Sequence, residues 1–260
     1  ETKDALQTAV DLWYNDNATA LSSYGVINTW DVSLITDMSS LFNGKSTFND
    51  DIGSWDVSSV TNMSTMFNNC NNFNQDLSNW DVSNVTDMSA MFTNCNNFNQ
   101  DLSSWDVSSA TNIRKMFKHT LVFNQDLSSW DVSKVTRMDY MFEYSPQFNG
   151  DISNWDVSSV TNMHKMLVNC YSFDQDLSNW NVELVTDFGS MFNNTDLSED
   201  NQCAIHTSFS SNDAWTYDWS GFCNVAGCTD VLACNYDEAA TNDDGSCLEN
   251  DCAGVCGGDA

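Results

Sequence analysis

Two columns of aspartate recur every 25 residues, and their carboxylates are the groups in this sequence best suited to chemistry. The first column comprises Asp51, Asp76, Asp101, Asp126, Asp151 and Asp176. The second column comprises Asp31, Asp56, Asp81, Asp106, Asp131 and Asp156. Carboxylate oxygens bind hard cations, and calcium accepts about six to eight such ligands in flexible geometry. The pattern therefore predicts Ca²⁺ bound along the two columns.

Like charges stacked in register need an offset. Neighbouring carboxylates about 4.8 Å apart, the spacing of paired strands, repel by roughly 1 kcal/mol in water and by more near a protein surface. Calcium between adjacent coils is one offset, with Asn and Ser oxygens completing its shell. The alternative is that each Asp accepts backbone N–H bonds at a turn, which stabilises the carboxylate without metal. The sequence leaves both explanations open.

A further candidate calcium site lies near the C-terminus, where oxygen-bearing side chains cluster around Gly245. The predicted ligands are Asp237, Asn242, Asp243 and Asp244. Their spacing is not that of the twelve-residue EF-hand loop. An ordinary polar turn between disulfides is the alternative explanation.

Catalysis has little support, because the carboxylates repeat down the whole array whereas an active site is a singular feature. The three histidines form no recognisable set with Ser, Cys or Asp, so we predict that the chain is not an enzyme. Basic residues cluster in one region: Arg114, Lys115, Lys118, Lys134, Arg137 and Lys165, with His119 and His164. This cluster either meets an anionic partner or pairs with Asp139 and Glu143.

The overall charge restricts the partners. The 260 residues include 37 acidic and 8 basic ones, for a net charge of -29. Nucleic acids and anionic membranes carry the same sign, so neither is expected as a direct partner. No apolar run approaches the roughly 18 residues of a membrane helix, and direct membrane insertion is not expected either. The chain begins at Glu1 without a signal peptide, as expected for the mature form of a secreted protein.

Tryptophan at positions 30, 55, 80, 105, 130, 155 and 180 fixes the repeat that must position these residues. A constant period of 25 residues is typical of a solenoid. Alternation in residues 98–103 predicts a short β-strand, and residues 86–92 predict a short helix with Thr86 as N-cap. We therefore predict a leucine-rich-repeat-like solenoid with one short parallel strand and one short helix per coil.

The string FNQDLSNWDVSNVTDMSAMF (residues 73–92) resembles the repeat of the BspA-type bacterial surface proteins, which are relatives of leucine-rich repeats. The resemblance covers roughly residues 26–197 and implies a secreted or surface-anchored protein that binds host, cell or matrix ligands. The last coil departs from the pattern, because Asn181 replaces the Asp and Glu183 the Ser. Residues 251–259 resemble the start of a thrombospondin type 3-like calcium repeat, so we expect a longer parent chain.

The predicted organisation has four parts. Residues 1–25 form a helical cap, residues 26–197 the seven-coil array, residues 198–223 a second cap, and residues 224–260 a Cys- and Asp-rich irregular module. Seven of ten cysteines crowd the last part of the chain, which predicts disulfides in an oxidising compartment. Cys203–Cys223 is one candidate bridge and Cys70–Cys95 another, whereas Cys170 is expected to remain a buried thiol.

These observations predict a secreted or cell-surface adhesion module that binds calcium and an unidentified protein or glycan ligand. Calcium shared between copies is a possible route to self-association. A passive structural spacer is the first alternative. Ice binding is the second, because Thr recurs once in every coil, from Thr36 to Thr186, although helix capping also explains that column.

Overall fold

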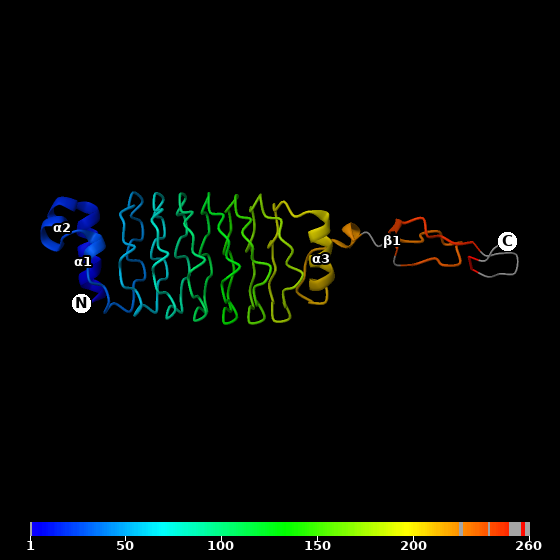
Figure 1. Cartoon of the computed structure of the whole chain (residues 1–260), viewed down its shortest axis with the longest axis horizontal. Coiled ribbons are helices and arrows are strands. Elements are labelled where there is room, and N and C mark those ends of the chain that lie inside the picture. Colours follow the sequence, from blue (N-terminus) through cyan, green and yellow to red (C-terminus); the bar gives the residue numbers. More distant parts are fainter. Residues whose placement is uncertain (1, 224–225, 239, 250–255, 258–260) are drawn as a thin grey trace.

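The computed structural model describes residues 2–223, 226–238, 240–249 and 256–257. The repeats wind into coils that stack along one axis, with helices at both ends of the stack and a tail beyond the second end (Figure 1). We count coils from each tryptophan, so coil 1 begins at Trp30 and coil 7 at Trp180.

Helix α1 (Lys3–Asn15) and helix α2 (Asn17–Tyr24) cover the first coil (Figure 1). Thr2 caps α1 by accepting a hydrogen bond from the N–H of Ala5, and Leu6, Ala9, Val10 and Trp13 form its buried stripe. Gly25, with φ of 75°, ends α2. A short 3-10 helix η1 (Ile27–Thr29) leads into the first coil. The helical N-terminus predicted from the sequence is thus seen.

The predicted pairing of one strand with one helix in each coil is wrong, because the coils are built from consecutive turns. Isolated parallel bridges take the place of strands in the coils, and they link the position seven residues after each Trp from Asp37 to Asn162. No strand forms over residues 98–103, since the N–H of Asn99 donates to the side-chain oxygen of Asn74 instead of to a backbone carbonyl, at 2.9 Å. The same side-chain ladder recurs from Asn49 to Asp174.

No helix forms over residues 86–92 either, because alternate N–H groups point to the next coil. The N–H groups of Met88, Ala90 and Phe92 donate to carbonyls of coil 4 at 2.8–3.0 Å. Ala90 has a φ of 55°, which lies in the left-handed region and interrupts any right-handed helix. Met88, Met91 and Phe92 therefore face the core from successive turns, which place the same i, i+3 and i+4 positions inward as a helix would.

Two positions per coil, 10 and 14 residues after each Trp, have positive φ. A β-turn with positive φ at its third residue favours Gly or Asn. The second position follows this rule with Gly44, Asn69, Asn94, Asn169 and Asn194. The first position has no Gly or Asn in any coil, so every coil holds at least one strained residue.

Relieving this strain is expected to stabilise the protein. Ala90→Gly should raise the free energy of unfolding by about 1 kcal/mol, because glycine adopts positive φ without a Cβ clash. Gly44→Ala is the reciprocal control and should lower it by a similar amount, since a Cβ there would meet nothing within 4 Å and only the backbone strain is added. Guanidinium unfolding of both variants measures the two effects. Equal stability of Ala90→Gly and wild type would contradict the assignment of strain.

The core is one continuous stack of aromatic and aliphatic columns. The rings of Phe67, Phe92, Phe117 and Phe142 stack at centroid distances of 5.5–5.7 Å, and each is fully buried. From coil 2 onward each buried Trp donates its indole N–H to the carbonyl 28 residues earlier in the chain, as Trp105 does to Leu77 at 3.0 Å. No coil closes a core alone, so each depends on its neighbours.

The second end is covered by helix α3 (Glu199–Phe209), which the sequence analysis did not predict as a helix. Its N-cap is Ser198, whose N–H donates to Asp174, the residue that ends the asparagine ladder. Ile205 and Phe209 are buried against the stack. A 3-10 helix η2 (Ser220–Phe222) follows, and then strands β1 (Ala226–Gly227) and β2 (Asn242–Asp243) pair in parallel.

Disulfides hold this C-terminal region. The predicted Cys203–Cys223 bridge is present, together with Cys228–Cys247 and Cys234–Cys256. The disulfide-rich, irregular character expected for this region is therefore seen. The thrombospondin-like resemblance falls mainly on residues 250–255 and 258–260, outside the described residues.

Candidate functional site

Both aspartate columns stack in register, and their carboxylates accept hydrogen bonds from the backbone two residues later. In the first column (Asp51, Asp76, Asp101, Asp126, Asp151 and Asp176) these distances are 2.8–2.9 Å. In the second column they are 3.0–3.1 Å, from Asp31 to Asp156. The hydroxyls of Ser33, Ser58 and Ser83 donate to the same oxygens. Each aspartate thus closes a side-chain turn.

These hydrogen bonds outweigh the repulsion between neighbouring aspartates. The pKa of Asp56 is lowered, chiefly by the hydroxyl and then by the N–H of Ser58, and the charge of Asp31 opposes this only weakly. The pKa values of Asp106, Asp131 and Asp156 are lowered in the same way by their serines. The pKa values of Asp76 and Asp126 are lowered first by the N–H of Ser78 and Ser128. The like-charge ladder therefore has an offset without a cation.

Within the described ranges, no group of three or more His, Cys, Asp or Glu side chains is placed to hold a metal ion. Calcium at the columns stays a prediction, which a melting experiment with calcium, with EDTA and with sodium chloride at equal ionic strength would test. A specific rise in melting temperature with calcium would support it.

The C-terminal candidate residues lie around the small two-stranded sheet. Asn242 and Asp243 form β2, and Asp243 accepts a hydrogen bond from the N–H of Gly245 at 3.0 Å. Asp244 accepts from the N–H of Ser246, and its pKa is lowered first by the Ser246 hydroxyl. The carboxylate of Asp237 lies against Gly227 of β1, where a Cβ would approach it to 3.3 Å. Asp243 and Asp244 thus close polar turns, and calcium at this group likewise stays a prediction.

Acidification is expected to destabilise the stack through the second column. A lowered folded pKa contributes stability above the unfolded pKa, and that contribution is lost as the pH falls through the folded value. Asparagine can close the same side-chain turn without a charge. Asn181 stands at this position in coil 7, and its side-chain oxygen accepts a hydrogen bond from the N–H of Glu183 at 3.1 Å. The variant Asp56→Asn/Asp106→Asn/Asp131→Asn should therefore lose less stability than wild type between about pH 6 and about pH 3. Urea unfolding at both pH values measures this, and parallel losses in both proteins would contradict it.

One surface departs from the uniform acidic repeat. Four of the eight Lys and Arg residues surround the ring of Tyr140 in coils 4 to 6, and a fifth, Arg137, shares the carboxylate of Asp139 with one of them. We call this group the basic patch: Arg114, Lys115, Lys118, Arg137 and Lys165. The amines of Lys115 and Lys118 each lie 5.4 Å from the Tyr140 ring centre. The Lys165 amine and the Arg114 guanidinium carbon lie at 5.9 Å. Cations held this close to an aromatic face gain electrostatic stabilisation.

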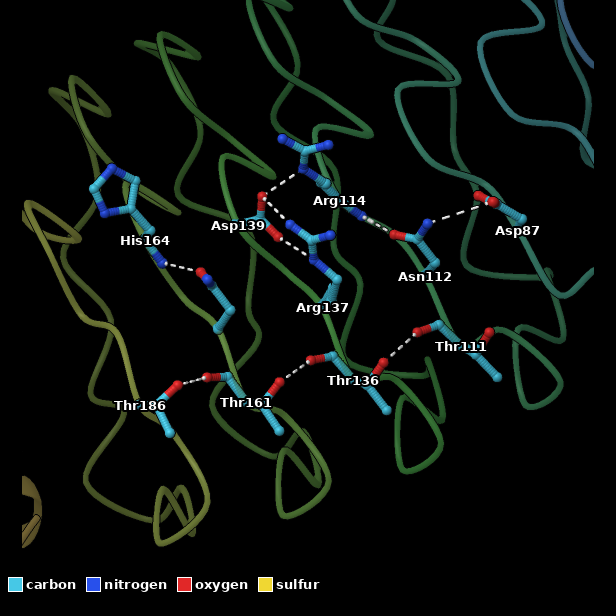
Figure 2. A network of polar contacts seen from close by, with 11 residues as sticks. Asp87, Thr111, Asn112, Arg114, Thr136, Arg137, Asp139, Thr161, His164 and Thr186 are labelled. Carbon is cyan, nitrogen blue, oxygen red and sulfur yellow. Dashed lines mark hydrogen bonds and ion pairs between the residues drawn. The ribbon is translucent and has the colours of Figure 1, made fainter. Parts of the chain in front are cut away.

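Part of the patch is neutralised internally. Asp139, only 2% exposed, accepts from Arg114 and also from Arg137 at 2.9 and 3.2 Å (Figure 2). Lys118 forms an ion pair with the buried Glu143. The predicted pairing of basic residues with Asp139 and Glu143 is thus confirmed for three of the five cations. His164 lies 3.3 Å from Asp187 at the edge of the same surface.

Lys115 and Lys165 have no carboxylate partner among the residues that the structure describes. The pKa of Lys115 is lowered by burial and then by the charges of Arg114 and Lys118. Such a lysine is crowded by like charge, and an anion beside it would relieve that crowding. The two lysines are therefore the groups of the patch most available to a ligand.

A hollow of about 340 Å³ lies beside the patch. Arg114, Lys115 and Lys118 form one wall. The remaining lining residues are Thr65, Asn68, Ser89, Ala90 and Thr93 of coils 2 and 3. A hollow with cations on one side and hydroxyl and amide groups on the other suits a ligand that carries both negative charge and hydroxyls.

The other singled-out residues have structural roles. Cys70 and Cys95 are free, so the predicted disulfide between them is wrong, and each thiol donates to a Phe carbonyl of the preceding coil at 3.0 Å. Burial raises the pKa of Cys70 to about 12 and that of Cys95 well above its usual value. Cys170 is a buried thiol, as predicted.

The threonine column does not cap helices. From Thr61 to Thr186 each hydroxyl donates to the carbonyl of the threonine one coil earlier at 3.0–3.3 Å, as Figure 2 shows for the last three of these bonds. The column therefore ties adjacent coils together. Ice binding by it stays a prediction.

The fold defines a tandem-repeat protein whose 25-residue coils share one apolar core and present one basic surface. A family model described as "Mycoplasma protein of unknown function, DUF285" matches residues 13–129 and 100–208, and the chain belongs to this family. No curated protein and no solved structure matches the chain.

Two further findings bear on location. Three disulfides lie in the C-terminal region, as is typical of proteins from oxidising, non-cytoplasmic compartments. Of the helices in the described part of the chain, none has the length and apolar character needed to cross a bilayer.

Proposed function

We propose that the chain is an extracellular, non-enzymatic binding module that uses the basic patch to hold an anionic ligand. The observation that carries this proposal is the gathering of four cations around Tyr140, with Arg137 bound to Asp139 beside them, on a protein of net charge -29. Two of these cations have no carboxylate partner among the described residues. The resemblance to BspA-type surface repeats and the disulfide-rich region support an extracellular setting.

The patch is singular within an otherwise regular repeat, which is the mark of a functional surface. Ser89 and Ala90 of coil 3 occupy the positions of Arg114 and Lys115, and Ser190 of coil 7 occupies that of Lys165. The stack forms with small uncharged residues at these positions in other coils. The cations are therefore not needed for the fold, and a binding role explains their presence.

The local charge is favourable to an anion despite the acidity of the chain. Five cations face two buried carboxylates, Asp139 and Glu143, which leaves an excess of three positive charges. At physiological ionic strength charges are screened over about 8 Å, so the patch acts largely independently of the distant aspartate columns. Four of its cations lie within 6 Å of the centre of the Tyr140 ring, and they come from coils 4 and 6 on either side of it.

Binding to short dextran sulfate fragments, with neutral dextran as the reference ligand, tests the proposal. Wild type should bind the sulfated fragments with an affinity that falls as salt rises. Lys115→Ala/Lys165→Ser introduces the residues of coils 3 and 7 and should weaken binding about tenfold, as expected for the loss of two charge contacts.

Lys134→Ser is the matched control, because it removes a cation outside the patch and introduces the residue found in the same column at Ser109 and Ser159. It should bind like wild type. Absence of wild-type binding would favour the alternative role of a passive spacer, and equal losses in both variants would show a nonspecific charge effect.

A further inference from the structure

An exposed apolar row runs beside the basic patch in the same three coils. We call it the aromatic ridge and define it as His119, Leu121, Tyr144, Pro146 and Tyr171. Leu121, Tyr144 and Tyr171 are 43%, 46% and 55% exposed. Large apolar side chains exposed together on one surface mark an interaction site.

Two members of the ridge from adjacent coils are in contact. The rings of His119 and Tyr144 lie 4.8 Å apart. Tyr144 donates its N–H to Val168 in coil 6, and the hydroxyl of Tyr171 lies 3.4 Å from the side-chain oxygen of Asn169 in the same coil. Lys118 of the basic patch directly precedes His119, so the patch and the ridge meet in coil 4.

Elsewhere the same positions are polar. Asn69 and Asn94 occupy the position of Tyr144, and Asn71 and Asn96 occupy that of Tyr171. Asparagine suits the positive φ at the first of these positions, where Tyr144 has a φ of 57° and His119 of 58°. Coils 4 and 5 thus carry strained aromatic residues in place of a residue that satisfies the turn, as expected where function opposes stability.

We infer that the ligand of this surface is an acidic carbohydrate, a sulfated or carboxylated oligosaccharide lying along coils 4 to 6. This inference rests on the proposed function. Aromatic rings pack against the apolar faces of sugar rings, and cations pair with the acidic groups.

The size of the surface agrees with this ligand. Two coil-to-coil steps of about 4.8 Å give a length of about 10 Å, which accommodates a disaccharide. A simple polyanion would use the cations but would have no reason to contact Tyr144 and Tyr171. The aromatic ridge therefore favours a carbohydrate over other anions as the ligand.

Dextran sulfate fragments and polyvinyl sulfate of similar length and charge provide the test, because both carry sulfates and only the first carries sugar rings. Tyr144→Asn/Tyr171→Asn, which introduces the residues of coils 2 and 3, should weaken binding of dextran sulfate about tenfold and leave binding of polyvinyl sulfate unchanged. Unchanged polyvinyl sulfate binding also shows that the variant is folded.

Three results would overturn the inference. No loss of dextran sulfate affinity, or an equal loss for both polymers, would remove the carbohydrate and leave the basic patch as an anion site. Failure of wild type to bind either polymer would overturn the proposed function itself. Lys115→Ala/Lys165→Ser should weaken binding of both polymers, which separates the contribution of the patch from that of the ridge.

Discussion

Replacing Phe117 by alanine is expected to lower the free energy of unfolding by about 3–5 kcal/mol. The ring is fully buried in coil 4, at the middle of the stack. It stacks on Phe92 and Phe142 at 5.7 Å and on Phe123 of its own coil at 4.1 Å. The cavity would therefore remove contacts both within one coil and between three coils, and guanidinium unfolding would show the loss.

Phe117→Leu is the matched control, since Leu167 stands at the same position in coil 6 and is also fully buried. Leucine fills much of the ring volume, so we expect a loss of about 1.5 kcal/mol or less. Losses of equal size in the two variants would contradict the view that the ring volume stabilises the stack.

Because the cavity left by Phe117→Ala lies in the central coil, it should also change the shape of the unfolding transition. In a stack of coils each unit is stabilised mainly by its neighbours, so a weak central coil uncouples the two ends. Phe117→Ala is expected to broaden the unfolding transition or divide it in two, whereas wild type should unfold in one. Tryptophan fluorescence and far-UV circular dichroism, which need not coincide in such a case, would reveal this.

The sequence predicted the period, the inward columns and the helical N-terminus, because these follow from apolar residues that must be buried. It did not predict how each coil closes. The spacing of Met88, Met91 and Phe92 is the same for a helix and for successive turns. The distinguishing signal was the Asn at positions such as Asn94, where a turn requires positive φ and a helix would not.

The aspartate columns show a second limit of the sequence. Repulsion between stacked carboxylates was recognised, yet its offset depends on where the N–H groups point, which spacing alone does not give. Every aspartate of the second column is followed two residues later by Ser, as in Asp106 and Ser108. This pairing is a usable signal for a side-chain turn.

The basic residues were identified from the sequence, but not their arrangement around Tyr140. Residues such as Lys115 and Lys165 are 50 positions apart, and only the stacking of coils brings both within 6 Å of one ring. The aromatic ridge was missed for the same reason. Comparing each position with its counterparts in the other coils would have revealed Tyr144 and Tyr171, because their column neighbours are asparagines.

The second large effect is expected at Asp139, which is buried between Arg114 and Arg137. Arg114→Ser/Arg137→Asn removes both partners and leaves a carboxylate with 2% exposure unpaired. Breaking a buried ion pair in this way typically costs about 3 kcal/mol or more. We expect the double variant to lose about that amount in urea unfolding at neutral pH.

Adding Asp139→Ser should restore most of the loss, because the three substitutions together reproduce what coils 2 and 3 already contain. Asn62 and Ser64 stand at the positions of Arg137 and Asp139, and Ser89 stands at that of Arg114. Asn62 accepts a hydrogen bond from the N–H of Ser64 at 2.9 Å, so the new pair can close the same turn. If the triple variant were no more stable than the double, the unpaired carboxylate would not be the cause. Recovery would instead show that coil 5 departs from the repeat for binding and not for stability.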